Sequence, residues 1–245
     1  MSTELKLPQC WIDVRDALES GLDRLIVNGP PGTGKSHAGL NYGIIPGRTA
    51  YRLTCNQEMT DAELRGHWMP TANGTWEWHD GALIQAWRDG TRVVIDEVDQ
   101  ASGDVLAIML AGTDSAESCQ WRSPATGEIV RPNDGFSVVM TTNVECMDDL
   151  PTALVDRFPV VIRINAPHPD ALTFLSEDLR VPASLSADAD IDRRISLRGW
   201  QAFDKARKHM VVKYGTDDGQ AKAARLVFGH RAESILDTLR INAVA

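Results

Sequence analysis

The stretch "GPPGTGKS" at residues 29–36 constrains this chain more than any other feature. It matches the pattern Gly-x-x-x-x-Gly-Lys-Ser at every fixed position, and such a loop cradles the phosphates of a nucleotide. The pattern predicts that the Lys35 ammonium reaches the β- and γ-phosphates and that the Ser36 hydroxyl coordinates Mg²⁺. The candidate nucleotide-binding residues are Gly29, Pro30, Pro31, Gly32, Thr33, Gly34, Lys35 and Ser36.

The residues on either side of the loop supply the context that such a motif requires. The apolar, β-branched run "RLIVN" at 24–28 predicts a buried strand, and "SHAGLNYGI" predicts a helix that begins at Ser36. A strand, a glycine loop and a helix in this order direct backbone N–H groups and the positive helix end at a phosphate. The alternative is a Gly/Pro-rich turn that matches by chance, and the flanking segments favour the nucleotide site.

A second motif, the acidic segment "RVVIDEVDQ" at 92–100, supplies groups for a metal ion. Its apolar residues predict a strand buried on both faces, and ligands bind at the carboxyl ends of such strands. Asp96 is therefore predicted to hold Mg²⁺ through water, and Glu97 to polarise the attacking water as a general base. The alternative is a solvated acidic turn. Asp99 is assigned to a solvated or capping position before the helix predicted at 102–112.

Two further polar residues follow the next strands. The run "FSVVMTTN" at 136–143 predicts a strand that ends at Asn143, which would orient the water or contact the γ-phosphate. Arg157 lies between a helical segment and a strand predicted at 160–164, where it would stabilise charge on the transferring phosphoryl group. The alternative for Arg157 is a surface ion pair with Asp156.

In this order the motifs resemble those of the AAA+ ATPases, and within them the MoxR-like, dynein-related branch that includes the CbbQ and NorQ activators and GvpN. The resemblance implies that Asn143 is the sensor 1 residue, Arg157 the arginine finger and Arg198 the sensor 2 residue. It also implies a homo-oligomeric ring, usually a hexamer, in which the finger acts on the ATP of a neighbour. The matching stretches are "GPPGTGKS", "TDAELRGHW", "WEWHDGALIQAWRDG", "VVIDEVDQ", "TTN", "LPTALVDRF" and "ISLRGW".

The resemblance implies a function as well as a fold. It predicts an ATPase that uses Mg²⁺ and ATP to remodel or activate a partner protein or a metalloenzyme complex, commonly together with a protein that carries a von Willebrand factor A domain. ATP is expected over GTP because no Asn-Lys-x-Asp stretch is present. The alternatives are a nucleic-acid motor or loader and a nucleotide-gated scaffold without turnover. Glu97, Asn143 and Arg157 together argue against the scaffold.

The expected fold class is α/β, with a P-loop NTPase core of a parallel sheet flanked by helices and a small C-terminal helical lid. The core is expected over residues 1–167 and the lid over 168–245, because "APHPD" at 166–170 marks a break. Within the lid, an apolar helix face is predicted from the spacing of Leu197, Trp200, Phe203 and Met210.

Two insertions, at about 64–87 and 118–136, are predicted to form hairpins. Asn73-Gly74 is a strong turn signal, and Trp76 and Trp78 alternate along the following strand, so they share one face. The resemblance implies that such hairpins project towards the pore of a ring, where exposed tryptophans would grip a polypeptide. The alternative, that Trp76, Trp78 and Trp121 pack into the domain, stays open because aromatic residues are mostly buried.

Composition narrows the partners. The formal net charge of −9 argues against broad nucleic-acid binding, which requires phosphate neutralisation. No apolar run approaches the ~20 residues of a membrane helix, and the N-terminal segment is polar, so neither a membrane span nor a secretory signal is expected. The four cysteines are widely spaced, which indicates reduced thiols and a cytoplasmic location. His67 and His79 match no common zinc spacing.

Overall fold

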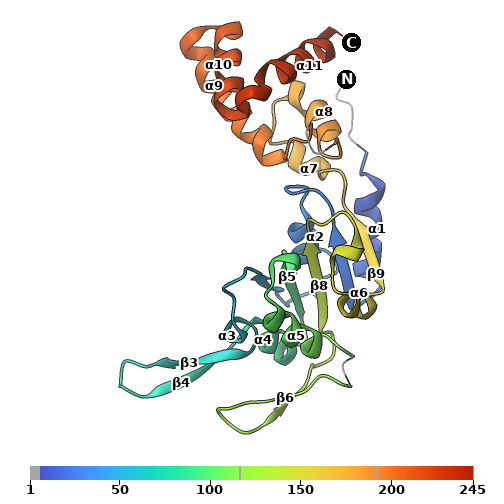
Figure 1. Cartoon of the computed structure of the whole chain (residues 1–245), viewed down its shortest axis with the longest axis vertical. Helices are drawn as coiled ribbons and strands as arrows, with labels where there is room; N and C mark the ends of the chain where they lie inside the picture. The colour runs from blue at the N-terminus through green and yellow to red at the C-terminus, as the bar shows by residue number, and fades with distance from the viewer. Residues whose placement is uncertain (1–5, 116, 191–192, 245) are drawn as a thin grey trace. The chain divides into compact units, whose positions relative to one another are not determined.

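The computed structural model describes residues 6–115, 117–190 and 193–244, and these form two compact units that are treated separately below (Figure 1). The first unit contains Ile12–Gly29 and Lys35–Arg163. The second contains the N-terminal residues up to Trp11, the loop segment Pro30–Gly34 and the chain from Ile164 onwards. The domain boundary predicted after residue 167 stays a prediction.

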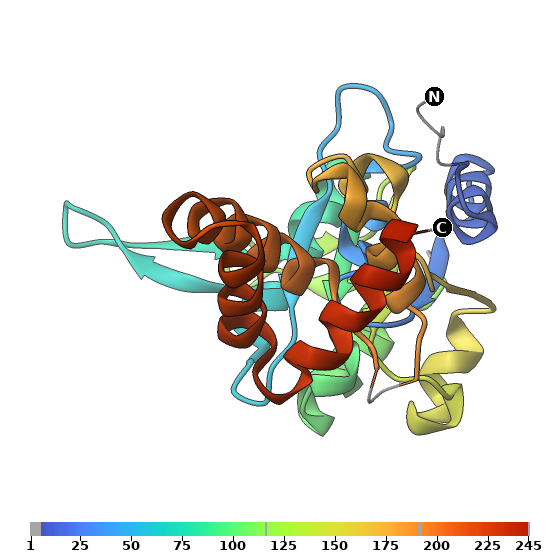
Figure 2. The same cartoon turned by 90° about the horizontal axis from the view of Figure 1, so that it is seen from above.

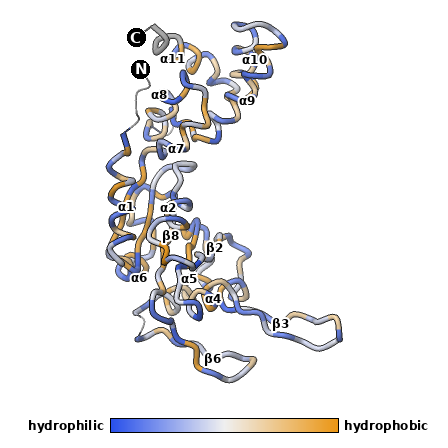
Figure 3. The backbone as a smooth tube through the Cα atoms, turned by 180° about the vertical axis from the view of Figure 1, so that it is seen from behind, coloured by the Kyte–Doolittle hydropathy of each residue, from blue (hydrophilic) through white to orange (hydrophobic). Residues whose placement is uncertain are grey.

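A parallel five-stranded sheet forms the centre of the first unit, in the order β2-β5-β8-β1-β9. The strands predicted from apolar runs are confirmed, and every residue of β5 is buried, as expected for a strand covered on both faces. Figure 3 shows the hydrophobic character of β8. The bounds are β1 (Arg24–Asn28), β2 (Tyr51–Thr54), β5 (Arg92–Asp96), β8 (Ser137–Thr142) and β9 (Val160–Arg163).

Helices cover both faces of this sheet. On one face the strand residues Val93 and Met140 share a core with Trp87 of α4 and Met109 of α5. On the other face α2 comes so close that a Cβ on Gly39 would lie 3.1 Å from Val139. The helices of the unit are the part of α1 (Gln9–Glu19) from Ile12 onwards, α2 (Lys35–Asn41), α3 (Asp61–Arg65), α4 (Ala82–Asp89), α5 (Gly103–Gly112) and α6 (Thr152–Arg157).

Both predicted hairpins are present. Strands β3 (Gly66–Pro70) and β4 (Trp76–Asp80) pair antiparallel around a turn in which Gly74 has a φ of +78°. The shorter β6 (Trp121–Arg122) and β7 (Ile129–Val130) pair in the same way. Figures 1 and 2 show that the β3–β4 hairpin extends away from the sheet of its own unit.

The tryptophans of the hairpins divide into two groups. The ring of Trp78 lies 5.6 Å from that of Trp68 across the hairpin and 5.8 Å from that of Trp121 on the second hairpin. Trp76, on the same strand face as Trp78, is 65% exposed. The packing alternative therefore holds for Trp78 and Trp121, whereas Trp76 remains at the surface.

The described part of the second unit from Ile164 onwards is helical. The predicted apolar face is confirmed, because Trp200 and Phe203 are buried and Leu197 and Met210 pack around them. Helix α10 approaches α9 so closely that a Cβ on Gly219 would lie 2.6 Å from the carbonyl of Met210. The helices are α7 (Pro169–Leu172), α8 (Glu177–Ser186), α9 (Leu197–Tyr214), α10 (Thr216–Phe228) and α11 (Ala232–Val244). Across the described residues of both units, no helix is long and apolar enough to cross a membrane.

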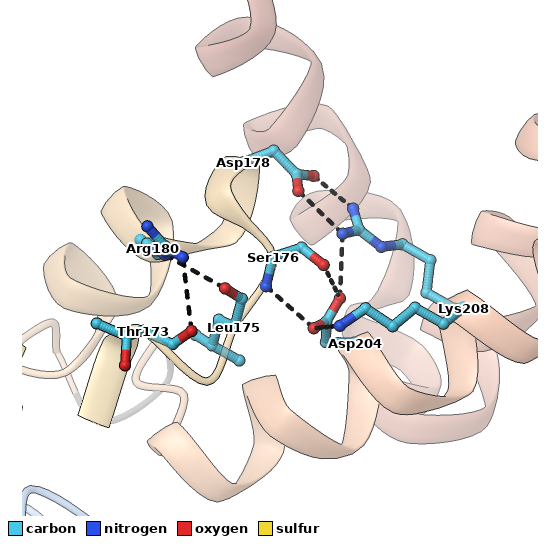
Figure 4. Close-up of polar contacts among 8 residues, drawn as sticks. Thr173, Leu175, Ser176, Asp178, Arg180, Asp204 and Lys208 are labelled. Carbon is cyan, nitrogen blue, oxygen red and sulfur yellow. Dashed lines mark hydrogen bonds and ion pairs between the residues drawn. The ribbon is translucent and has the colours of Figure 1, made fainter. Parts of the chain in front are cut away.

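A buried carboxylate joins α8 to α9 in the second unit (Figure 4). Asp204 accepts hydrogen bonds from the backbone N–H of Ser176 at 3.1 Å, from the Ser176 hydroxyl at 2.8 Å and from Lys208 Nζ at 2.7 Å. Burial alone would raise the pKa of Asp204, but the bonds from Lys208 and Ser176 hold the pKa below its ordinary value. The ionised form of Asp204 therefore stabilises the folded unit.

We expect Asp204→Asn to lower the free energy of unfolding by about 1–3 kcal/mol at pH 7, because charge-assisted bonds to a buried group are lost. Since the folded pKa is depressed, the stabilisation is complete above the ordinary pKa of aspartate and declines below about pH 4. The difference in the free energy of unfolding between Asp204→Asn and the native chain should therefore become smaller below about pH 4. Urea unfolding followed by circular dichroism measures this, with Asp218→Asn, at an exposed position of α10, as the matched control. Equal stability of both variants at pH 7 would contradict the assignment.

Candidate functional site

Three polar strand ends meet at one edge of the sheet in the first unit. Strands β5, β8 and β1 are neighbours in the sheet, so Asp96, Thr142 and Asn28 end side by side. Glu97 and Asn143 follow directly in the chain. Because ligands of open α/β folds bind outside the carboxyl ends of the strands, this edge is the candidate functional site.

Lys35, the first residue of α2, joins two of the predicted site residues. Its buried ammonium donates hydrogen bonds to the Gly29 carbonyl and to Asn143 Oδ1, both at 2.9 Å. The first bond joins the residues on either side of the segment Pro30–Gly34, and the second ties Lys35 to the residue that follows β8. The structure thus brings Lys35 and Asn143 together, as their predicted roles require.

The loop backbone has the form that its glycines allow. Gly29, Gly32 and Gly34 have φ values of +139°, +80° and +100°, a region that favours glycine. Within the second unit the Thr33 hydroxyl donates to the Pro30 carbonyl at 2.9 Å.

Gly34 is further restricted by its surroundings in that unit, because a Cβ there would lie 3.0 Å from the ring of Trp11. Pro31 is exposed and Ser36 is half-buried. The nucleotide contacts of these residues stay a prediction.

Asp96 is almost completely buried and has two protein partners. Its Oδ1 accepts a hydrogen bond from the Thr141 hydroxyl at 2.9 Å, and its Oδ2 accepts one from Arg52 Nε at 2.6 Å. Neither partner was predicted, because each comes from a different strand and only the folded sheet brings it to Asp96. Thr141 is the first residue of the "TTN" motif, which is the one sequence signal for it.

The donors at this edge fit a magnesium ion. The Asp96 carboxylate and the Ser36 hydroxyl offer the oxygen ligands that Mg²⁺ prefers. The local charge is negative: burial first, and then the charges of Asp96, Asp99 and Glu97, raise the pKa of the nearby Cys55 thiol to about 12. The guanidinium against Asp96 also shows that this carboxylate attracts a cation.

Glu97 has an unusual backbone. Its φ is +57°, and it is the one non-glycine residue with a positive φ in the described ranges. Such a conformation costs about 1–3 kcal/mol and occurs preferentially at functional sites. The Thr141 hydroxyl accepts a hydrogen bond from the Glu97 N–H at 3.3 Å while donating to Asp96, so one hydroxyl fixes both acidic residues. The Glu97 side chain is exposed.

The interpretation of Asp99 as a solvated or capping residue is wrong. The Thr142 hydroxyl donates to Asp99 at 2.6 Å, and Ser102 caps α5 instead. The reason is a 3-10 turn at Val98–Gln100, which directs Asp99 back towards β8. Burial alone would raise the pKa of Asp99, but the bonds from Thr142 and Gln100 hold the pKa below its ordinary value.

Arg157 is the last residue of α6. The alternative stated for it was a surface ion pair with Asp156, but its contacts are different. Its Nε lies 3.4 Å from Asp114 Oδ2, an ion pair without hydrogen-bond geometry, and its Nη1 donates to the Ala153 carbonyl at 2.8 Å. The partner is therefore Asp114 and not Asp156.

Arg198 belongs to the second unit, in the first turn of α9. Ser196, which caps this helix, lies beside the phosphate loop, because a Cβ on Gly32 would be 3.2 Å from Ser196 Cβ. Arg198 itself is exposed. The start of α9 thus lies beside the loop segment of its own unit, and the sensor 2 role of Arg198 stays a prediction.

Comparison with known proteins agrees with this geometry. The sequence model of the AAA domain (dynein-related subfamily) matches residues 24–158, more than half of the chain. Protein CbbQ of Hydrogenophilus thermoluteolus is 31% identical over 137 residues, which cover 55% of this chain and 50% of CbbQ. Protein NorQ of Paracoccus denitrificans is 29% identical over 119 residues, which cover 49% and 43%. The chain thus spans half or less of the length of these curated relatives. The MoxR-like resemblance is confirmed.

Solved structures support the fold alone. The structure of NtrX from Brucella abortus has a TM-score of 0.55 at 16% identity, covering 93% of this chain and 50% of that one. The structure of NtrX in complex with ATP has a TM-score of 0.51 at 16% identity, with coverages of 97% and 69%. The predicted α/β class with a parallel sheet flanked by helices and a helical C-terminal region is confirmed.

The bridging hydroxyl of Thr141 yields a test of this geometry. We expect Thr141→Val to lower the free energy of unfolding by about 1–3 kcal/mol, because buried Asp96 loses a donor and the Glu97 N–H loses an acceptor. Thr141→Ser keeps the hydroxyl and should retain most of the stability. Urea unfolding measures both. A valine variant as stable as the serine variant would show that the bridge has no energetic importance.

Proposed function

Because the chain belongs to the AAA domain family, dynein-related subfamily, we propose that it is a Mg²⁺-dependent ATPase that remodels or activates a partner protein or metalloenzyme complex. One observation carries the proposal. Lys35 of the phosphate loop donates a hydrogen bond to Asn143, which follows β8, and Asp96 ends β5, the strand next to β8. A lysine for phosphate, a carboxylate for metal and an amide for water are thereby assembled in one unit.

The proposed chemistry assigns one step to each residue. The loop N–H groups and Lys35 bind the phosphates, and Lys35 exchanges Asn143 and the Gly29 carbonyl for phosphate oxygens. Ser36 and Asp96 would hold Mg²⁺, which supplies charge neutralisation when bound. Glu97 takes the proton of the attacking water, whose position Asn143 fixes. Because Thr141 fixes the backbone of Glu97, its exposed carboxylate can turn towards the water without a change in the sheet.

Arg157 and Arg198 extend the proposal to assembly. We infer that Arg157 acts as an arginine finger on the ATP of a neighbouring copy in a ring, usually a hexamer. The long contact to Asp114, at 3.4 Å and partly exposed, is weak enough to exchange for a phosphate. Arg198 is proposed as sensor 2, because α9 begins beside the loop segment Pro30–Gly34 of its own unit.

The first hairpin supports a protein partner over a nucleic acid. Residues 66–80 contain neither lysine nor arginine, whereas nucleic-acid binding requires such cations. Trp76 and Trp68 lie on one face of the hairpin and are 65% and 44% exposed, a surface suited to apolar side chains of a polypeptide. A partner with a von Willebrand factor A domain and action in the cytoplasm remain part of the proposal. The free thiols of all four cysteines support a reducing compartment.

Two variants test the chemistry. We expect Glu97→Gln to keep binding Mg·ATP while turnover falls about 100-fold or more, the usual contribution of a positioned base. Lys35→Ala should lose nucleotide affinity, because its ammonium contacts the phosphates. Binding is measured with a fluorescent ATP analogue and turnover by phosphate release. Near-native turnover of Glu97→Gln, or unchanged affinity of Lys35→Ala, would remove that residue from its role.

The same assay separates the classes of partner. Phosphate release is measured with and without DNA, and a pull-down with Glu97→Gln under ATP traps protein partners. Stimulation by DNA would favour a nucleic-acid motor, and ATP binding without any turnover would favour a scaffold.

Assembly is tested by mixing two inactive variants. Arg157→Ala should be about 10³–10⁵-fold slower while still binding ATP, the usual contribution of a finger. Lys35→Ala cannot hold ATP but still carries Arg157. Mixed under conditions of subunit exchange, they form interfaces with all parts present, so hydrolysis should return and grow with protein concentration. If subunits exchange and no activity returns at any ratio, the finger does not act between copies in this way.

A further inference from the structure

Arg52, the second residue of β2, covers the buried carboxylate of Asp96. Strand β2 pairs with β5 in a register that places Thr54 opposite Asp96, so Arg52 lies two residues earlier along the same edge strand. Its Nε lies 2.6 Å from Asp96 Oδ2. The side chain of Asp96 is 2% exposed and that of Arg52 is 53% exposed. A half-exposed cation therefore closes a buried anion from the solvent side.

This contact gives Asp96 the charge compensation that burial demands. A buried carboxylate without a counter-charge is strongly unfavourable. Its Oδ1 has the Thr141 hydroxyl, which is neutral, so the cation at Oδ2 supplies the compensation. The free-energy cost of moving the half-exposed Arg52 side chain away from Asp96 is small, because its guanidinium regains hydration as it moves outwards.

We propose that Arg52 is a placeholder for the metal: it neutralises Asp96 in the nucleotide-free chain and is displaced when Mg²⁺ arrives with ATP. The inference rests on the proposed function, in which Asp96 faces the metal. Arg52 occupies Oδ2, one of the two oxygens of the carboxylate that would hold the metal. A dication and a guanidinium on one oxygen repel each other, so occupation by one weakens occupation by the other.

The surroundings of Arg52 give the displaced side chain a destination. A cavity of about 470 Å³ has Arg52 in its wall, together with Glu63 of α3, His67 of β3 and Asp80 of β4. Both carboxylates already accept hydrogen bonds, Glu63 from Thr60 and Asp80 from Arg88 and Trp78, so a released guanidinium would enter an existing polar network. His67 and Asp80 lie at the foot of the β3–β4 hairpin, so a movement of Arg52 reports metal occupation to the hairpin proposed as the partner surface.

The test measures Mg²⁺-dependent binding of a fluorescent, non-hydrolysable ATP analogue to the full chain. If Arg52 competes with the metal, Arg52→Gln should lower the Mg²⁺ midpoint about 5-fold or more, the scale of a typical coupling between sites. Arg65→Gln removes the same charge from the neighbouring α3, where Arg65 faces Asp61 at 4.0 Å, and should leave the midpoint unchanged. An unchanged or higher midpoint in Arg52→Gln would overturn the proposal.

Thermal unfolding supplies a second readout. Without metal, Arg52→Gln should unfold at a lower temperature than the native chain, and Mg²⁺ with the analogue should narrow that gap. If the difference in unfolding temperature between Arg52→Gln and the native chain stays the same with Mg²⁺ and the analogue, Arg52 has a purely structural role. If Arg52→Gln does not fold, Arg52→Met removes the charge but keeps a long unbranched side chain; it should shift the midpoint in the same direction, and no shift would count against the proposal.

Asp96→Asn distinguishes this proposal from the proposed function. Loss of Mg²⁺ dependence in Asp96→Asn without a shift in Arg52→Gln would reject the placeholder and keep the metal role of Asp96. Unaltered Mg²⁺ dependence in Asp96→Asn would reject the metal role itself.

Discussion

A buried negative charge at the end of β5 determines how the candidate site is built. Asp96 lies where the sheet excludes water. Its carboxylate accepts hydrogen bonds from the Thr141 hydroxyl of β8 and from the Arg52 guanidinium of β2. The Thr141 hydroxyl also accepts the N–H of the next residue, Glu97. A strand that ended in an apolar residue would need none of these partners. Glu97 follows directly in a left-handed conformation, with a φ of +57°, and begins the 3-10 turn after the strand.

The second balance in the site concerns the positive charge of Lys35. Its buried ammonium is held by a carbonyl and an amide oxygen, both neutral dipoles. These two bonds hold the ammonium at the end of the sheet, close to the strand end that carries Asp96. The edge of the sheet thus presents an ammonium and carboxylates together, the combination that a phosphate chelated to a cation fits.

The sequence was sufficient for the fold and for part of the site, for a physical reason. The inner strands β1, β5 and β8 are apolar runs that are almost completely buried, and the loop glycines have positive φ, so both leave local signals. Arg52 left no such signal and Thr141 only its place in the "TTN" motif, because each meets Asp96 only through the lateral order of strands that are distant in the sequence. The misassigned Asp99 shows the same limit: a single 3-10 turn decides whether a carboxylate faces solvent or the neighbouring strand.

The hairpins show how far alternation along a strand can be used. It correctly places Trp76 and Trp78 on one face, but their exposure differs because the second hairpin supplies Trp121 against Trp78 alone. One hairpin thus has an anchored foot and a free outer part. The anchored foot contains Asp80, which accepts hydrogen bonds from Trp78 Nε1 and Arg88 Nε at 2.7 Å. Since Asp80 also lines the cavity beside Arg52, a change in charge at the metal edge has a route to the part of the hairpin that is fixed, and through it to the part that is free.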